Sequence, residues 1–240
     1  MQVKTTENNT ISLPEVHVSY SAPLPPGELL LAGGGRAPAA DWLCQAAGGR
    51  QLWCIDRGID CCHRAGLVPL RLIGDGDSAT EQSWQWAEEN NVPIEKFPVK
   101  KDYTDTQLAL EMAAAEQKYV VLTGAMGGRF DHAYSTIFSF GHSNIQGCIA
   151  DEQEAVFFLR GKEKINLALR RQAKAISLLP LTAAVSGVTI QGVYWPLQDA
   201  DLTQELPYAV SNEADGEKIT IALADGILAV YICWQENNLA

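Results

Sequence analysis

The pattern that most constrains the fold is an alternation of short apolar runs with longer helical stretches, from Glu28 to about residue 150. The clearest strand-like runs are residues 29–32, 51–55, 70–73 and 119–123, and weaker ones are residues 94–97 and 145–149. Strands that alternate with helices of this length are typical of a mainly parallel sheet covered on both faces. We therefore predict an α/β domain over residues 28–155.

The stretches between these runs have helical character. Helices are predicted over residues 39–47, 59–65, 79–90, 105–117 and 132–140. The fourth is the best defined, because Leu108, Met112 and Ala115 recur at helical spacing. Thr104, with Gln107 three residues later, predicts a capping box at the start of this helix.

Beyond Ala155 the pattern changes to short strand-like runs separated by turn signals such as Asp215-Gly216. Strand-like runs cover residues 156–159, 175–179, 188–190, 209–210, 218–223 and 226–232. Such a series predicts an antiparallel sandwich or barrel over residues 156–240. Within it, residues 163–171 leave two interpretations open, a short helix from Asn166 or an irregular link. Residues 1–27, polar and then proline-rich, are interpreted as an extension that leads into the fold.

Charge and cysteine content narrow the class of protein. The chain of 240 residues carries 18 basic and 29 acidic side chains, a formal net charge of -11, and has no block of Lys and Arg. This argues against nucleic-acid binding. Six cysteines without a CxxC pair are expected to be core thiols and not zinc ligands or disulfides. Because we find no signal-peptide pattern and no apolar run of membrane-spanning length, a cytoplasmic protein is expected.

Three short acidic motifs point to the chemistry: Gly74-Asp75-Gly76-Asp77-Ser78, Lys101-Asp102-Tyr103-Thr104-Asp105 and Gly127-Gly128-Arg129-Phe130-Asp131-His132. The first and third follow closely on apolar runs, where an open α/β sheet places its ligand site. Converging carboxylates, with glycines that let the backbone approach closely, indicate a magnesium ion that carries a polyphosphate. Asp56, after the second strand, fits the same site.

Each motif also has a purely structural interpretation. Gly and Asp favour tight turns, and acidic residues at a helix start complement its dipole. Arg129 suits phosphate recognition and Asp131 a metal or ribose contact, whereas His132 is equally consistent with a cap. The run Gly33-Gly34-Gly35-Arg36 is only a weak nucleotide signal, because neither a full GxGxxG nor a GxxxxGK[ST] is present.

Taken in order, these pieces resemble the thiamine pyrophosphokinase family over roughly residues 28–232. The resemblance rests on Asp56-Arg57-Gly58, the three acidic motifs with Leu108-Ala109-Leu110, and the run from Gly124 to His132. The C-terminal half contributes Ile176-Ser177-Leu178-Leu179-Pro180-Leu181, Gly192-Val193-Tyr194-Trp195-Pro196-Leu197, Val210-Ser211-Asn212-Glu213 and Asp225-Gly226-Ile227-Leu228. Each piece is modest alone, whereas the ordered set is specific.

The resemblance implies transfer of a pyrophosphoryl group from ATP to the hydroxyl of thiamine, giving thiamine diphosphate and AMP. It also implies an α/β domain, a C-terminal β-sandwich that binds thiamine, and a homodimer with active sites near the interface. Magnesium and phosphates would be bound by Asp75, Asp77, Asp102, Asp105 and Asp131, with Asp75, Asp77, Asp105 and Asp131 as metal ligands and Arg129 as a phosphate contact. Further cofactor contacts are expected from Asp56, Lys101, Thr104, Gly128 and His132, and thiamine contacts from Ser211 and Asn212.

The chain departs from the family pattern at two places. Gly76 stands where an aromatic residue usually separates the two aspartates, and Gln107 replaces a common acidic residue. Tyr194 and Trp195 are candidates for the aromatic that stacks on thiamine in some members. Two alternatives therefore stay open: transfer to another heterocyclic alcohol, or a non-catalytic nucleotide or thiamine diphosphate sensor. Asp75→Asn would separate enzyme from sensor, because only an enzyme has turnover to lose.

Overall fold

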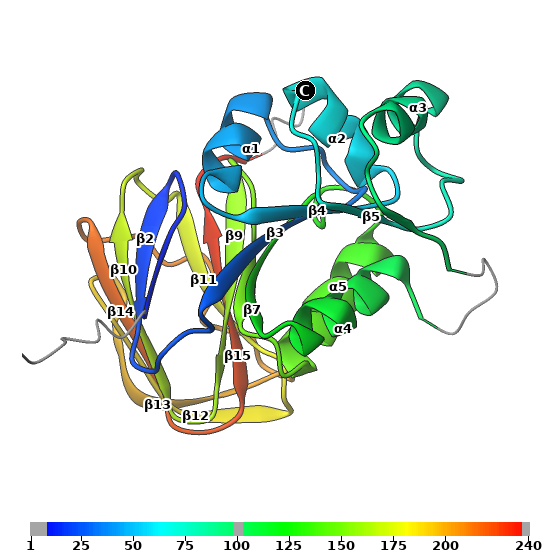
Figure 1. Ribbon diagram of the computed structural model, residues 1–240. Helices are drawn as coiled ribbons and strands as arrows, with labels where there is room; N and C mark the ends of the chain where they lie inside the picture. The colour runs from blue at the N-terminus through cyan, green and yellow to red at the C-terminus, as the bar shows by residue number, and fades with distance from the viewer. Residues whose placement is uncertain (1–8, 98–102, 237–240) are drawn as a thin grey trace, which may run out of the picture. The chain divides into compact units, whose positions relative to one another are not determined.

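A computed structural model describes residues 9–97 and 103–236 of the chain (Figure 1). The chain divides into two compact units. One is continuous, Gly27–Ala155, and the other combines Met1–Pro26 with Val156–Ala240. The segment before Gly27 belongs with the β unit and not with the α/β unit.

Within the described residues, the continuous unit is built on six parallel strands. Their order across the sheet is β8-β7-β3-β4-β5-β6. The strands are β3 (Gly27–Ala32), β4 (Gln51–Ile55), β5 (Arg71–Ile73), β6 (Ile94–Glu95), β7 (Lys118–Thr123) and β8 (Gly147–Ala150). Successive strands advance outward from β3 to β6, and the chain then returns to place β7 on the other side of β3. Such a reversal opens a crevice at the carboxyl ends of the two strands.

Helices cover both faces of this sheet, with α1, α2 and α3 on one face and α4 and α5 on the other (Figure 1). They are α1 (Ala40–Ala47), α2 (Gly58–Ala65), α3 (Glu81–Glu89), α4 (Asp105–Ala115) and α5 (Phe130–His142). Because both faces are covered, the central strands are apolar on both sides: Leu29 to Leu31 and Val120 to Leu122 are fully buried. The predicted α/β class and its parallel sheet are confirmed.

The second unit is antiparallel. One sheet has the order β1-β2-β10-β14-β12-β13, and the strands β11, β15 and β9 are neighbours in a second layer. The first layer contains β1 (Thr10–Ser12), β2 (Val16–Tyr20), β10 (Glu163–Leu169), β12 (Ala184–Gln191), β13 (Leu197–Thr203) and β14 (Lys218–Leu223). The second contains β9 (Glu154–Arg160), β11 (Ala175–Pro180) and β15 (Ile227–Cys233). The β-sandwich of the prediction is confirmed.

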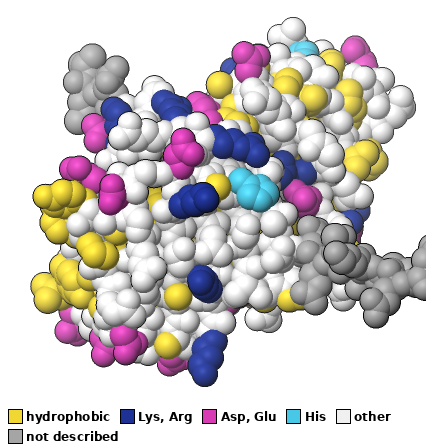
Figure 2. Space-filling model, turned by 90° about the vertical axis from the view of Figure 1, so that its left-hand side faces the viewer, with side chains coloured by type: hydrophobic (Ala, Val, Ile, Leu, Met, Phe, Trp, Pro, Cys, Tyr) yellow, Lys and Arg dark blue, Asp and Glu magenta, His cyan; other side chains and the backbone are white. Residues whose placement is uncertain are grey.

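The outer face of the six-stranded sheet is polar. Lys164 and Asn166 on β10 are exposed, as is Lys218 on β14, while Ile165 and Leu167 between them are buried. Figure 2 shows basic side chains and a histidine spread over this face among polar atoms. Alternation of this kind follows from the two-residue period of a strand with one solvated face.

The interpretation of residues 1–27 as an extension outside the fold is wrong for β1 and β2. β2 pairs with β10, with Val16 opposite Leu169 and Tyr20 opposite Ile165. Val16 and Val18 are fully buried. The segment Val16–Tyr20 has alternating apolar and polar residues, which is a strand pattern, although the average composition of the N-terminal segment is polar.

Both interpretations of residues 163–171 are also wrong, because β10 is a strand between β2 and β14. Its alternate residues Ile165, Leu167 and Leu169 are buried. Two further differences are smaller: β13 was not predicted, since as an edge strand it leaves most side chains exposed, and residues 209–210 are not in a strand. No helix in the described ranges is long and apolar enough to cross a membrane.

Candidate active site

A cavity of about 500 Å³ opens at the carboxyl ends of the strands of the α/β unit. It is lined by Gly34, Gly35, Ile55, Asp56, Arg57, Ser78, Thr104, Asp105, Thr106, Gly124, Ala125, Gly128, Arg129, His132 and Thr136. These residues follow β3, β4, β5 and β7 or begin α4 and α5. The size is within the usual range for a small-molecule site.

Glycines form one side of the cavity by bringing two loops together. The N–H of Gly35 donates to the carbonyl of Gly124 at 2.6 Å, and the N–H of Gly33 donates to Thr123 at 2.8 Å. A Cβ on Gly35 would lie 2.6 Å from that Gly124 oxygen, and one on Gly124 would lie 2.3 Å from the Gly33 oxygen. Only glycine allows this backbone contact, which leaves a bare peptide surface on which phosphate oxygens can rest.

Arg36, next to these glycines, does not line the cavity. Its guanidinium donates to Asp151 and to Glu154, each at 2.5 Å, and its side chain is largely buried. Burial raises the pKa of Asp151, although the hydrogen bond from Arg36 opposes that effect. Arg36 therefore anchors the glycine loop to the turn before β9.

Asp56 is the most unusual side chain of the cavity. It lies directly after β4 with a φ of 43°, and its Oδ1 is buried with no hydrogen-bond partner. A Cβ on Gly74 would lie 1.7 Å from Oδ1, so the glycine of the first acidic motif provides the room for this carboxylate. Burial, then the neighbouring Asp105, and then Asp75 and Asp77 raise the pKa of Asp56 to about 7.

Three of the predicted aspartates, Asp75, Asp77 and Asp105, are thus brought together around Asp56. Asp105 has the largest effect of the three on the pKa of Asp56, through its charge and through a hydrogen bond, whereas Asp75 and Asp77 act only through their charge. Asp75 is half-buried and accepts from the N–H of Asp77 at 3.1 Å. The loop they share bends at Gly76, which has a φ of 82°, and a Cβ there would lie 2.8 Å from the Trp84 ring.

The start of α4 has the predicted capping box. The N–H of Gln107 donates to Thr104 Oγ1 at 3.2 Å, and the N–H of Thr104 donates to Gln107 Oε1 at 2.9 Å. The Gln107 amide also donates to Ser139 Oγ on α5 at 3.0 Å. A carboxylate could not make this last donation, so Gln107 links the two helices that contribute Asp105 and His132 to the cavity.

The third motif is divided by the structure. Gly128, Arg129 and His132 line the cavity, whereas Asp131 does not. Asp131 is exposed and pairs with Arg129 at 2.5 Å, a bond that lowers the pKa of Asp131. Asp131 is also absent from the charges that act on Asp56. Lys101 and Asp102 lie outside the described residues.

In the described part of the chain, no three His, Cys, Asp or Glu side chains lie close enough together to hold a metal ion by themselves. Asp105, Asp75 and Asp77 act on Asp56 electrostatically. Magnesium commonly uses one or two carboxylates and completes its shell with water and substrate phosphate. The buried, unpartnered Oδ1 of Asp56 beside Asp105 fits that arrangement.

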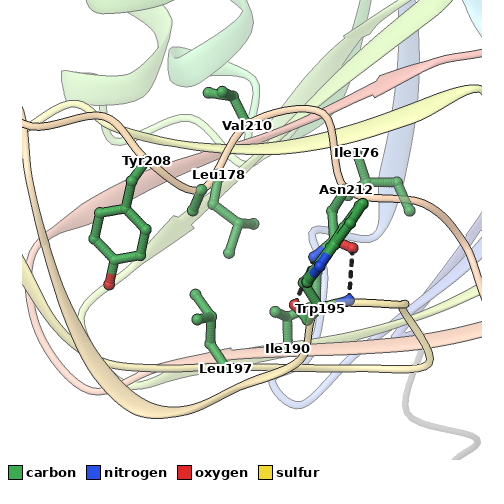
Figure 3. Close-up of a pocket in the computed structure, with 9 residues that line it drawn as sticks. Ile176, Leu178, Ile190, Trp195, Leu197, Tyr208, Val210 and Asn212 are labelled. Carbon is green, nitrogen blue, oxygen red and sulfur yellow. Dashed lines mark hydrogen bonds between the residues drawn. The ribbon is translucent and has the colours of Figure 1, made fainter.

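Ser211 and Asn212 lie in the β unit, where Asn212 but not Ser211 lines a second cavity of about 120 Å³. Its lining is Ile176, Leu178, Ile190, Trp195, Leu197, Tyr208, Ala209, Val210 and Asn212. Figure 3 shows aliphatic side chains lining the space, with Trp195 beside Asn212 and Tyr208 on the other side. The ring of Trp195 is 55% exposed, so an aromatic surface at the cavity is free to meet a ligand.

Comparison with known proteins identifies one family for both parts of the chain. Residues 48–149 match the family Thiamin pyrophosphokinase, catalytic domain, and residues 162–228 match Thiamin pyrophosphokinase, vitamin B1 binding domain. The chain belongs to the thiamin pyrophosphokinase family. The family predicted from the sequence is confirmed, and the protein is an enzyme of that family, a kinase that makes thiamine diphosphate.

Individual thiamin pyrophosphokinases are similar over most of the chain. A thiamine pyrophosphokinase of Bacillus subtilis is 29% identical over 182 residues, which cover 74% of this chain and 85% of the relative. A thiamin pyrophosphokinase of Caenorhabditis elegans is 23% identical, over 67% of this chain and 68% of the relative.

Solved structures of the family share the fold. The crystal structure of the Bacillus subtilis thiamine pyrophosphokinase has a TM-score of 0.77 at 24% identity and covers 87% of this chain and 100% of its own. The yeast thiamin pyrophosphokinase has a TM-score of 0.68 at 16% identity and covers 86% of each chain.

Several lining residues of this thiamin pyrophosphokinase were not predicted. Arg57 contacts the carbonyl of Gly34 with its guanidinium and stands next to Asp56, so its position in the motif was a usable signal. Thr106 and Thr136 line the cavity from the first turn of α4 and from α5. Nothing in their local sequence distinguishes them from ordinary helical residues.

Proposed function

We propose that the protein transfers the intact β,γ-pyrophosphoryl group of magnesium-ATP to the hydroxyl of thiamine, with the cavity around Asp56 as the ATP site. The observation that carries this proposal is the buried, unpartnered Oδ1 of Asp56, which has Asp105 beside it and Asp75 and Asp77 close by. Carboxylates gathered at a strand end repel one another unless a cation lies between them.

Magnesium would be held by Asp56 and Asp105, and the negative charges of Asp75 and Asp77 would add to its attraction. The ion would neutralise the charge that develops on the phosphate oxygens during transfer. Asp131, which the sequence proposed as a metal ligand, is paired with Arg129 and is assigned here to holding that guanidinium. Asp102 remains part of the proposal from sequence alone.

The residues of the cavity would orient ATP. The loops at Gly35, Gly124 and Gly128 present backbone to the phosphates, and Arg129 and Arg57 supply positive charge at the cavity lining. In the transfer, the thiamine oxygen bonds to the β-phosphorus and the bond from that phosphorus to the α,β-bridging oxygen breaks. AMP leaves, and the hydroxyl proton passes to solvent. Positioning is the main task of the protein in such a reaction.

Thiamine would bind at the cavity of the β unit. Its aliphatic lining suits a heterocycle, and Trp195 and Tyr208 offer aromatic faces to a cationic ring. Asn212 lines this cavity, and Ser211 precedes it in the chain, which supports the proposal of a thiamine site here. All six cysteines are free thiols: Cys44 is exposed, and the buried ones are Cys54, Cys61, Cys62, Cys148 and Cys233. Free thiols support a reducing compartment and the expected cytoplasmic location.

We further propose a homodimer. Transfer requires the ATP cavity and the thiamine cavity to meet, and the family resemblance implies that they do so near a subunit interface. Exposed aromatic and aliphatic side chains around the thiamine cavity, namely Tyr194, Trp195, Leu206, Tyr208 and Val210, support an interface there.

The deciding experiment uses ATP labelled in one phosphate and identifies the product that carries the label. With purified protein and magnesium, γ-labelled ATP should yield labelled thiamine diphosphate, and α-labelled ATP should yield labelled AMP, only when thiamine is present. ADP formation would contradict pyrophosphoryl transfer. AMP formation with another heterocyclic alcohol but not with thiamine would retain the chemistry and change the substrate. Asp56→Asn is the control that should abolish both signals.

A further inference from the structure

The Asn212 amide is directed toward protein backbone. Its Oδ1 accepts from the N–H of Trp195 at 3.1 Å, and its Nδ2 donates to the carbonyl of Trp195 at 2.7 Å. Oδ1 also accepts from the N–H of Glu213 at 2.9 Å. These three bonds use both acceptor positions of the amide oxygen and one of its two N–H donors.

The backbone of Asn212 is fixed as well. Its N–H donates to the carbonyl of Ile176 and its carbonyl accepts from the N–H of Ile176, both at 2.8 Å. Ile176 is a fully buried residue of β11. Asn212 therefore ties Trp195 to a core strand (Figure 3).

Trp195 has little else to hold it. It lies in a short segment whose neighbour Tyr194 donates its N–H to Glu213 at 2.9 Å, and the two aromatic rings meet edge to face at 4.6 Å. Tyr194 is itself 68% exposed, so it provides no core contact. Without the Asn212 amide, the backbone of Trp195 loses both hydrogen bonds that the structure gives it.

We propose that Asn212 is a positioning residue that fixes Trp195 at the cavity, and that Trp195, not Asn212, contacts the heterocyclic cation bound there. The inference rests on the proposed function, which makes this cavity the thiamine site. It changes the expected role of Asn212 from a substrate contact to a clamp on the substrate-contacting ring.

The first test is independent of activity. Residue-resolved amide hydrogen exchange should show the Trp195 N–H protected in the wild type and exchanging at least about tenfold faster in Asn212→Ala. Asn212→Asp keeps the acceptor for the Trp195 N–H but loses the donation to the Trp195 carbonyl, so the Trp195 N–H should exchange at a rate between those of the wild type and Asn212→Ala, which also serves if the alanine variant folds poorly. Asn166→Ala removes an exposed asparagine of the same unit that accepts from Thr220 at 2.9 Å, and should leave the Trp195 N–H unchanged. Unchanged exchange in Asn212→Ala would overturn the clamp.

The second test asks whether Asn212 acts through Trp195. Asn212→Ala should raise the KM for thiamine by about tenfold, with little change in the KM for ATP, because ordering of one side chain is lost. Trp195→Ala should raise it at least as much, and the double variant should match Trp195→Ala alone. Additive effects would show a direct contact by Asn212 and overturn the proposal. A wild type without thiamine-dependent AMP release would instead refute the proposed function, while the exchange test still decides the clamp.

Discussion

At the scale of single residues, Asp56 shows how a site is assembled at a cost to stability. Its carboxylate is buried among three others, and its pKa is raised from an ordinary 3.8 to about 7. A raised carboxyl pKa means that the folded state binds the proton more tightly than the unfolded chain. The stability that this tighter proton binding at Asp56 contributes is fully present below about pH 4 and is lost as the pH rises through 7.

Asp56→Asn should therefore stabilise the metal-free protein at pH 8, by about 1 to 2 kcal/mol once partial solvent exposure is taken into account. The gain should disappear toward pH 4, where the wild-type carboxyl is protonated. Turnover should fall by more than about 100-fold, because a proposed metal ligand is lost. Urea unfolding in EDTA at several pH values measures the first effect, and AMP release the second.

Asp131→Asn is the matched control. The pKa of Asp131 is lowered by Arg129, so its ionised form is favoured in the folded state. The substitution should give no stabilisation at pH 8. An Asp56→Asn protein that is no more stable than the wild type at pH 8 would contradict the crowding of charge at Asp56.

Residues also mark the limit of what the sequence could predict. Asp56 and Asp105 could be placed near each other, because the carboxyl ends of parallel strands share one edge of the sheet. The pairing of Asp131 with Arg129 could not, since rotation about two bonds decides whether that carboxylate faces the cavity or its neighbour. The use of the Asn212 amide on the Trp195 backbone depends on a contact between residues 17 positions apart.

At the scale of elements, the glycine loop after β3 depends on the space around each residue. Gly35→Ala would place a Cβ 2.6 Å from the Gly124 oxygen, whereas Gly128→Ala would place one at 3.7 Å from the nearest atom. The first should destabilise the protein by about 1 to 3 kcal/mol and raise the KM for ATP by about tenfold or more. The second should leave the unfolding free energy within about 0.5 kcal/mol of the wild type. Equal stability losses in the two variants would contradict the close backbone contact.

The strand β2 provides the second test at this scale. Val18 is fully buried, so Val18→Asp should lower the unfolding free energy by about 3 kcal/mol or more. Ser19→Asp, on the solvated face of the same strand, should change it by about 0.5 kcal/mol or less. Thermal or urea unfolding distinguishes the two, and equal small effects would restore the interpretation of this segment as an extension.

The errors in predicting elements have a common physical origin. The helices and parallel strands of the α/β unit were found because they are long or wholly apolar. The strands β2 and β10 each have one solvated face, so their average composition is polar and only the alternation of Val16, Val18 and Tyr20, or of Ile165, Leu167 and Leu169, identifies them. A polar average composition therefore hides both strands unless the two-residue period is read.

At the scale of the whole molecule, the proposed dimer makes a prediction about shared sites. Asp56→Asn lies in the ATP cavity and Trp195→Ala in the thiamine cavity; at a thiamine concentration well below the KM, the first homodimer should be nearly inactive and the second should keep about a tenth of the wild-type activity or less. If each active site combines cavities from two protomers, a heterodimer of the two variants has one intact site. Heterodimers isolated by two different affinity tags should then show about half of the wild-type activity per dimer.

A heterodimer of Asp56→Asn with Asp105→Asn is the control. Both substitutions damage the ATP cavity, so both sites are defective and no activity should return. An inactive heterodimer of Asp56→Asn with Trp195→Ala would show that each site belongs to one protomer. Failure to isolate any heterodimer would contradict the dimer itself.

The placement of β2 beside β10 has a consequence for biosynthesis. The α/β unit is an uninterrupted stretch of chain and can fold as soon as it leaves the ribosome, whereas the partner of β2 is made roughly 150 residues later. β2 can pair with β1 at once, but at typical translation rates of about 5 to 20 residues per second its other edge waits for about 10 to 30 seconds for β10. The N-terminal segment of the nascent chain therefore still requires chaperone protection after the α/β unit has buried its own apolar residues.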